Sequence, residues 1–168
     1  QDADEAEPID RAIGDALARY GSGLLPFHNH ASASYSPVFH YPYSRTATAV
    51  DQLRVRGEVD PHQGLKLTYV NPMTGGPAMP GIEAFVQGLI PKTTTRSYRS
   101  TDATVFSVVE GRGQVHMENQ VLEWSAHDTF VIPSWYEYRL EAFDEVLLFG
   151  FSDRPLQRYL GIWRDARA

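Results

Sequence analysis

The sequence predicts an all-β fold with flanking helices, in which an antiparallel sandwich or barrel forms one structural domain. Short segments of strand composition follow one another closely between residues 104 and 151. Tight turns such as Glu110-Gly111-Arg112-Gly113 separate them, as expected for strands that pair with their neighbours. The 168 residues are enough to bury a single core, so one domain is expected.

Residues 1–60 are expected to form helices and an extended arm. Pro8 suits a first helical turn, and apolar residues recur at helical spacing until Gly21 stops the pattern. From there to residue 43 the segment is rich in Gly, Pro, Ser and aromatic residues without periodicity, which indicates a long loop over a surface. Residues 44–56 predict a second helix that ends at Gly57.

Residues 61–153 are expected to form the barrel, and residues 154–168 a C-terminal helical segment. Two strands are predicted at residues 65–70 and 82–89, with a turn-rich segment between them. Six more are predicted at residues 104–109, 114–118, 120–124, 129–132, 138–140 and 145–151. The C-terminal helix is predicted at residues 155–164, with Leu156, Leu160 and Trp163 on its inner face.

The composition argues against several classes of function. The formal net charge of −6 at pH 7 leaves no basic surface for phosphates, so nucleic acid is not expected as a partner. No apolar run approaches the roughly 20 residues that cross a bilayer, so no membrane is expected either. Without cysteine, a metal site needs histidine and carboxylate ligands, and a cytoplasmic location is expected. The chain begins with Gln1, which we interpret as a trimmed or missing N-terminus.

Two segments carry the skeleton of a metal-binding β-barrel motif. The first is the glycine turn Glu110-Gly111-Arg112-Gly113, and the second is Asp-Thr-Phe-Val-Ile-Pro at residues 128–133. They resemble the two motifs of the cupin family, whose members are small jelly-roll barrels, also called double-stranded β-helices. The resemblance implies a cupin barrel with an N-terminal helical arm and a C-terminal helix.

The cupin motifs also imply where metal ligands belong. The first motif has two histidines, a glutamate and a glycine, and the second has a glycine, a proline and a third histidine. Carried over residue by residue, the first two histidines fall on Tyr98 and Ser100, the glutamate on Thr104 and the third histidine on Tyr138. Trp135 stands where the family has a glycine. Because hydroxyl side chains are poor ligands for divalent metals, we expect no metal, no cofactor-binding residue and no catalytic residue in this barrel.

A second resemblance covers nearly the whole chain. The block Asn-Pro-Met-Thr-Gly-Gly at residues 71–76 and the segments 36–46, 98–106 and 153–164 resemble the C-terminal half of gentisate 1,2-dioxygenase. They are also similar to the relatives that act on salicylate and 1-hydroxy-2-naphthoate. The resemblance implies two cupins in one chain, with Fe(II) and a gentisate-like aromatic hydroxy acid bound by an N-terminal cupin domain. This segment is then a structural or oligomerisation domain, inactive alone and part of a homo-oligomer.

Two other functions are kept open. A stand-alone metal-free cupin can act as a small-ligand-binding or assembly module, because barrel interiors often hold small molecules. The aromatic residues of the arm, 27–43, favour packing across a partner in either case. The chain alone can also be an active dioxygenase that uses His28, His30 and His40, a weak hypothesis because these residues lie in an irregular segment.

The interior of the barrel has two interpretations. Tyr98, Ser100, Asp102, Trp135 and Tyr138 can line a pocket. The favoured alternative is a filled interior, because two tyrosines and a tryptophan are bulky enough to occupy the space.

The other histidines and three arginines are not expected to form a binding site. His116 is expected on a polar outer face of its strand and His127 in a turn, while His62 has no evident partner. The arginines 96, 99 and 112 can bind a carboxylate, but surface charge is the favoured interpretation.

Overall fold

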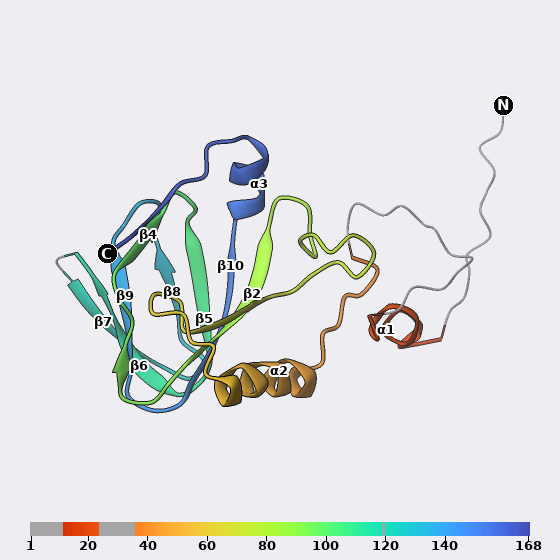
Figure 1. Cartoon of the computed structure of the whole chain (residues 1–168), viewed down its shortest axis with the longest axis horizontal. Coiled ribbons are helices and arrows are strands. Elements are labelled where there is room, and N and C mark those ends of the chain that lie inside the picture. Colours follow the sequence, from red (N-terminus) through yellow and green to blue (C-terminus); the bar gives the residue numbers. More distant parts are fainter. Residues whose placement is uncertain (1–11, 24–35, 119) are drawn as a thin grey trace.

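Two antiparallel sheets face each other in the computed structural model, which describes residues 12–23, 36–118 and 120–168 (Figure 1). The first sheet has the strand order β1-β2-β10-β5-β8. Its strands are β1 (Leu65–Thr68), β2 (Glu83–Leu89), β10 (Val146–Ser152), β5 (Thr104–Glu110) and β8 (Thr129–Ile132). The second has the order β11-β4-β9-β6-β7, and β3 also pairs with β9. Its strands are β11 (Asp165–Arg167), β4 (Tyr98–Ser100), β9 (Tyr138–Ala142), β6 (Arg112–Met117), β7 (Gln120–Ser125) and β3 (Thr93–Thr94).

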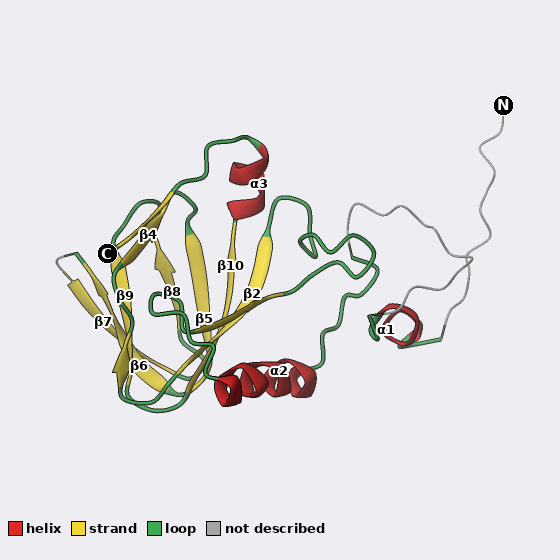
Figure 2. Cartoon of the chain, in the orientation of Figure 1, coloured by secondary structure: helices red, strands yellow, loops and turns green. Residues whose placement is uncertain are grey.

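The described part of the chain has three helices beside the sheets, namely α1 (Asp15–Tyr20), α2 (Tyr43–Arg56) and α3 (Arg154–Tyr159) (Figure 2). Helix α2 lies against the outer face of the first sheet, where Val50 packs on Leu65 and Leu147. It approaches so closely that a Cβ built on Gly88 would lie 2.7 Å from Val50 Cγ1. The helix ends at Gly57, whose φ of 72° lets its N–H bond back to carbonyls of the last turn.

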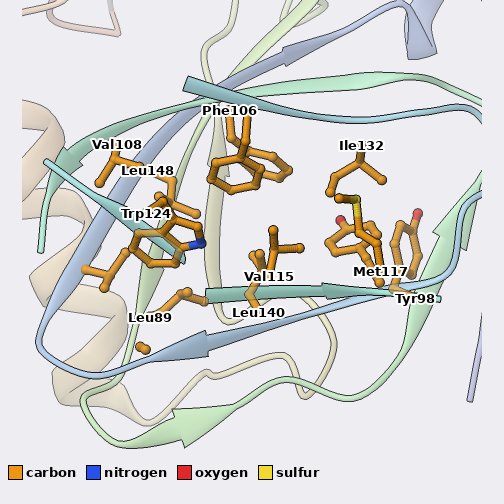
Figure 3. Close-up of a cluster of buried hydrophobic side chains, with 14 of the residues drawn as sticks. Leu89, Tyr98, Phe106, Val108, Val115, Met117, Trp124, Ile132, Leu140 and Leu148 are labelled. Carbon is orange, nitrogen blue, oxygen red and sulfur yellow. The ribbon is translucent and has the colours of Figure 1, made fainter. Parts of the chain in front are cut away.

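The core fills the space between the two sheets (Figure 3). Alternate side chains of each strand point inward, as in β5, where Phe106 and Val108 are buried and their neighbours are not. The rings of Phe106, Phe130 and Trp124 form a stack, with centroids 5.1 and 5.9 Å apart. Trp124 lies toward one end of the barrel and Tyr98 toward the other (Figure 3).

The predicted fold class is confirmed, and the eight predicted strands lie within two residues of those observed. The second helix is also confirmed, starting one residue earlier than predicted. No helix in the described part of the chain is long and apolar enough to cross a membrane. The division into residues 1–60, 61–153 and 154–168 stays a prediction.

The C-terminal prediction is wrong in part. Helix α3 has six residues instead of ten, and Leu156 and Leu160 are 46% and 57% exposed, so neither lies on an inner face. The reason is tertiary: the chain leaves the helix so that β11 can pair with β4, register Ala166 to Arg99. The sequence prediction also missed β3, β4 and β11, which have only two or three residues each.

The N-terminal prediction is tested only in part. The described helix α1 begins at Asp15, so the predicted helix is wrong at residues 12–14, which are not helical, and its start at residues 8–11 lies outside the described residues. His28 and His30 also lie outside them, so their prediction stays untested.

Candidate functional site

The four residues at the cupin ligand positions all point into the barrel. Tyr98, Ser100, Thr104 and Tyr138 are each at most 6% exposed. Strands β4 and β9 place Tyr98 directly opposite Tyr138, and their rings lie perpendicular with centroids 6.0 Å apart. Tyr138 also contacts the ring of Phe106, so both tyrosines belong to the core.

This donor set does not fit Fe(II), which binds imidazole and carboxylate groups. Burial raises the pKa of Tyr98, and burial likewise raises the pKa of Tyr138 well above its usual value. Both phenols therefore keep their protons at neutral pH, and a protonated phenol is a poor ligand. Within the described ranges, no group of three or more His, Asp or Glu side chains is arranged to hold a metal ion.

Beside the tyrosines lies a buried ion cluster formed by Asp102, Arg154 and Glu83. Arg154 Nε is 3.4 Å from Asp102 Oδ2, and Arg154 Nη1 is 3.6 Å from Glu83 Oε2. The indole N–H of Trp163 donates a 2.7 Å hydrogen bond to Asp102 Oδ1. Burial raises the pKa of Asp102, but the Arg154 guanidinium and the Trp163 bond outweigh it, so the net pKa lies below its usual value.

A partly buried lysine, whose amine points inward, completes this polar end of the barrel. Lys66 lies opposite Gln87 in the β1–β2 register, and its Nζ sits 3.7 Å from the centre of the Phe85 ring. The ammonium group also donates a 3.1 Å hydrogen bond to Gln63 Oε1. Burial is the main cause that lowers the pKa of Lys66 to about 7. The sequence analysis missed this residue, because a lysine that alternates with Leu65 and Leu67 is normally expected on the solvent-facing side of a strand. Here the two leucines face helix α2, and Lys66 points to the other face of the sheet.

We expect that replacing Lys66 by methionine stabilises the fold more at pH 6 than at pH 9. The lowered pKa means that, between pH 7 and the ordinary lysine pKa, the unfolded chain binds a proton that the folded chain does not. Wild-type stability therefore rises with pH in this window, by on the order of 1 kcal/mol per pH unit. Urea unfolding at the two pH values measures the difference. The exposed lysine variant Lys92→Met is the control, and an equal effect of Lys66→Met at both pH values would contradict a lowered pKa.

Trp135 does not fill the interior, contrary to the sequence prediction. It is 41% exposed, and the Arg99 guanidinium stacks 4.7 Å from its ring centre. Its φ of 65° is a left-handed conformation, which explains why a glycine suits this place in the cupin motif. Trp135 therefore belongs to a surface turn and does not line an interior pocket.

The arginines 96, 99 and 112 and His116 lie at separate places in the structure. Arg112 pairs with Asp144 at 2.7 Å on the surface, whereas Arg99 stacks on Trp135, so these two cations contact different partners. Arg96 is exposed. His116 Nε2 lies 2.8 Å from Glu141 Oε2 on the outer side of the second sheet.

The described histidines of loops and turns lie apart from the ligand positions. His127 occupies a turn with φ 77°. His40 is exposed. The prediction that His62 has no partner is wrong, because it is buried with Nδ1 3.0 Å from the Ser97 carbonyl.

A separate apolar groove of about 530 Å³ lies where α1, the arm and β1 meet. Tyr20, Val38 and Tyr69 line it. The described part of the arm is tied to the barrel, since the Tyr41 hydroxyl donates to the Val70 carbonyl at 2.9 Å. The groove includes none of the cupin ligand positions.

Comparison with known proteins identifies homologues of the chain. The chain is 46% identical over 164 residues to gentisate 1,2-dioxygenase 1 of Aquipseudomonas alcaligenes, a match that covers 98% of the chain. The chain is a homologue of part of the gentisate 1,2-dioxygenases. It is also 25% identical over 162 residues to 1-hydroxy-2-naphthoate 1,2-dioxygenase of Nocardioides. No protein-family model matches the chain.

The fold agrees with that of a solved gentisate 1,2-dioxygenase relative. Salicylate 1,2-dioxygenase from Pseudoaminobacter salicylatoxidans, whose structure was determined with gentisate, superposes with a TM-score of 0.83 at 31% identity over 91% of the chain. The match covers 43% of that structure and 47% of the Aquipseudomonas protein. The chain therefore spans about half the length of its gentisate 1,2-dioxygenase relatives, and the resemblance to their C-terminal half is confirmed.

Proposed function

We propose that the chain is the C-terminal, metal-free cupin domain of a gentisate 1,2-dioxygenase-like enzyme that cleaves aromatic rings. In this proposal an N-terminal cupin domain binds Fe(II) and a gentisate-like aromatic hydroxy acid. The observation that carries it is the chemistry of the ligand positions. Tyr98 and Tyr138 sit in the core as neutral phenols, and Ser100 and Thr104 offer only hydroxyls. The described residues thus supply a barrel and its surfaces, and the oxygen chemistry is assigned to the other half.

The surface around α3 supports a structural role. Exposed apolar side chains lie on the helix, in the segments before and after it, and directly before strand β2. They are Ile82, Phe151, Leu156, Tyr159, Leu160 and Ile162. An apolar group of this kind typically marks an interface. We infer that it packs against the N-terminal cupin domain, because the relatives are about twice the length of this chain. Homo-oligomerisation stays a prediction from the resemblance.

Iron content per chain tests the metal-free assignment. After anaerobic reconstitution with Fe(II) and desalting, we expect far less than one iron per chain, because the interior hydroxyls cannot compete with water for the ion. A full-length relative handled in parallel is the control for reconstitution. Near-stoichiometric iron in this chain would overturn the proposal and direct attention to His28, His30 and His40.

Activity tests the division of labour between the two halves. We expect no oxygen consumption when the chain alone meets gentisate and Fe(II), and ring cleavage when an N-terminal cupin of a family member is joined to it. The opposite outcome is that the chain alone cleaves gentisate and that the double variant His28→Ala, His30→Ala does not. This result would identify the segment as a complete dioxygenase.

A further inference from the structure

The groove between α1, the arm and β1 has the size and the lining of a small-molecule site. Its volume of about 530 Å³ falls within the range of about 300–1,000 Å³ that is usual for such sites. Aliphatic surface comes from four segments, with Leu17 on α1, Val38 on the arm, Leu67 on β1 and Val86 on β2. Helix α1 lies beside the N-terminal end of α2, so segments far apart in the sequence form the groove (Figure 1).

Aromatic rings make up a large part of the lining. Tyr20, Tyr41 and Tyr69 all border the groove. The rings of Tyr41 and Tyr69 have centroids 5.0 Å apart and planes at 60°. The Tyr41 hydroxyl donates to the Val70 carbonyl and lies 3.0 Å from Ser36 Oγ, so this ring is held in place. Because aromatic side chains contact other flat ring systems favourably, the groove favours a ligand with a planar apolar body.

One cation stands at this groove without an anion. Arg45 is the charged residue among the described lining residues, which include no aspartate or glutamate. Its Nη1 donates a 3.0 Å hydrogen bond to the carbonyl of Gly21, which also lines the groove. In the described part of the chain, no carboxylate lies within ion-pair distance of Arg45. A guanidinium has several N–H donors, so most of them stay available, and in a chain of net charge −6 this groove favours an anion.

A pair of hydroxyl groups adds a neutral donor. Thr46 Oγ1 and the Tyr69 phenol oxygen lie 3.2 Å apart, and both residues line the groove. Whichever of them donates, the bond uses one of the two hydroxyl hydrogens. The other hydrogen has no acceptor among the residues that the structure describes. A carboxylate oxygen can accept it as well as the guanidinium N–H bonds.

We propose that this groove is a binding site for a small aromatic carboxylate, with the ring against Tyr41 and Tyr69 and the carboxylate at Arg45. The tyrosines favour the flat ring, and the guanidinium supplies the complementary charge. A neutral ligand leaves Arg45 without a counterion, and a cationic ligand is repelled by it. The proposal rests on the lining of the groove and not on the dioxygenase assignment, because the groove contains none of the cupin ligand positions.

Calorimetric titration of the whole chain with 2-naphthoate at pH 7 tests the site. We expect saturable binding with a Kd of about 1 mM or tighter, as is usual for a ligand of this size. The neutral 2-naphthamide has nearly the same shape and should bind about fivefold or more weakly, because it lacks the charge. Decanoate, an aliphatic carboxylate, should also bind more weakly, because it has no ring. Absence of saturation by 2-naphthoate, or equal binding of decanoate, would overturn the proposal.

Variants of helix α2 locate the bound ligand. Arg45→Gln should weaken binding of 2-naphthoate about fivefold or more and leave binding of 2-naphthamide unchanged. Arg56→Gln is the matched control, because Arg56 is an exposed arginine of the same helix that is not among the described lining residues. Ala49→Leu adds bulk to the lining and should weaken binding of both ligands. Equal effects of Arg45→Gln and Arg56→Gln would show that only the overall charge matters, which contradicts the proposal.

The design stays decisive if a variant does not fold. Circular dichroism identifies such a variant, and the comparison of 2-naphthoate with 2-naphthamide on the unchanged chain then tests the charge requirement. The probe carries no hydroxyl group beside its carboxylate, so it is not of the hydroxy-acid class assigned to the N-terminal cupin domain. Since the titration measures neither iron nor ring cleavage, its failure is distinct from failure of the proposed function.

Discussion

Replacing Arg154 by methionine should lower the free energy of unfolding at pH 7 by about 3–5 kcal/mol, which is the cost of breaking a buried ion pair from one side. Arg154 is the cation between Asp102 and Glu83, and the Asp102 side chain is fully buried. Methionine keeps much of the side-chain volume against Trp163, so the main loss is electrostatic. Urea unfolding with a fixed m-value measures it.

Surface and double variants show whether charge is the cause. Arg112→Met removes an exposed pair with Asp144 and should cost less than about 1 kcal/mol. Adding Asp102→Asn to Arg154→Met should recover part of the loss, because one uncompensated carboxylate disappears. If Arg154→Met and Arg112→Met lose the same amount of stability, and Asp102→Asn restores none of it, Arg154 acts through packing alone.

The pH dependence of the same variant has a defined sign. Because Arg154 helps to lower the pKa of Asp102, the stabilisation is present above the ordinary carboxyl pKa, about 4. It is lost as the pH falls through the lower folded value, since the protonated acid no longer needs a cation. The difference in the free energy of unfolding between the wild type and Arg154→Met should therefore become smaller in acid. A difference that becomes larger below pH 4 would contradict the ion-pair explanation.

Replacing Gly113 by alanine should destabilise the barrel by about 3 kcal/mol or more, through overpacking. A Cβ at this position would lie 2.1 Å from the Glu141 carbonyl oxygen and 2.6 Å from the Trp124 ring. The backbone oxygen belongs to the paired strand β9 and cannot retreat without breaking the sheet. We expect a lower midpoint of thermal unfolding and loss of the near-ultraviolet signal of Trp124 at intermediate temperature.

Gly76→Ala is the matched control for this substitution. Gly76 has no positive φ, and the nearest neighbour that a Cβ there would meet is the Thr74 side-chain oxygen at 3.4 Å. Its replacement should change stability by less than about 0.5 kcal/mol. If Gly113→Ala is tolerated equally well, the close contact between β6 and β9 does not constrain the residue.

The regular strands were predictable because their signal is local. The segment at residues 129–132 alternates exposed and buried side chains, and the structure places strand β8 at the same residues. Helix α3 was overestimated because its apolar spacing continues past Tyr159, whereas the chain turns away to pair β11 with β4. Short strands of two or three residues depend on partners far away in the sequence, and no local pattern marks them.

The polar end of the barrel was only partly predictable. The motif resemblance singled out Tyr98, Ser100, Thr104 and Tyr138, and the structure brings them inside. It missed Lys66, because alternation with Leu65 and Leu67 is typical of a solvent-facing lysine and gives no sign of an interior one. Trp135 was placed inside on bulk alone, but its left-handed turn directs it to the surface.

The sequence alone predicted the fold class and the resemblance to gentisate 1,2-dioxygenase. It also shows that the four cupin ligand positions carry neither histidine nor glutamate. Periodicity, turn residues and motifs are all properties of short segments, so the sequence is enough to find them. The inward direction of Lys66, the sharing of Arg154 by Asp102 and Glu83, and the outward position of Trp135 were decided by the folded chain. Charge pairing joins residues up to 107 positions apart, as between Arg167 and Asp60, and such pairs exist only once the chain has folded.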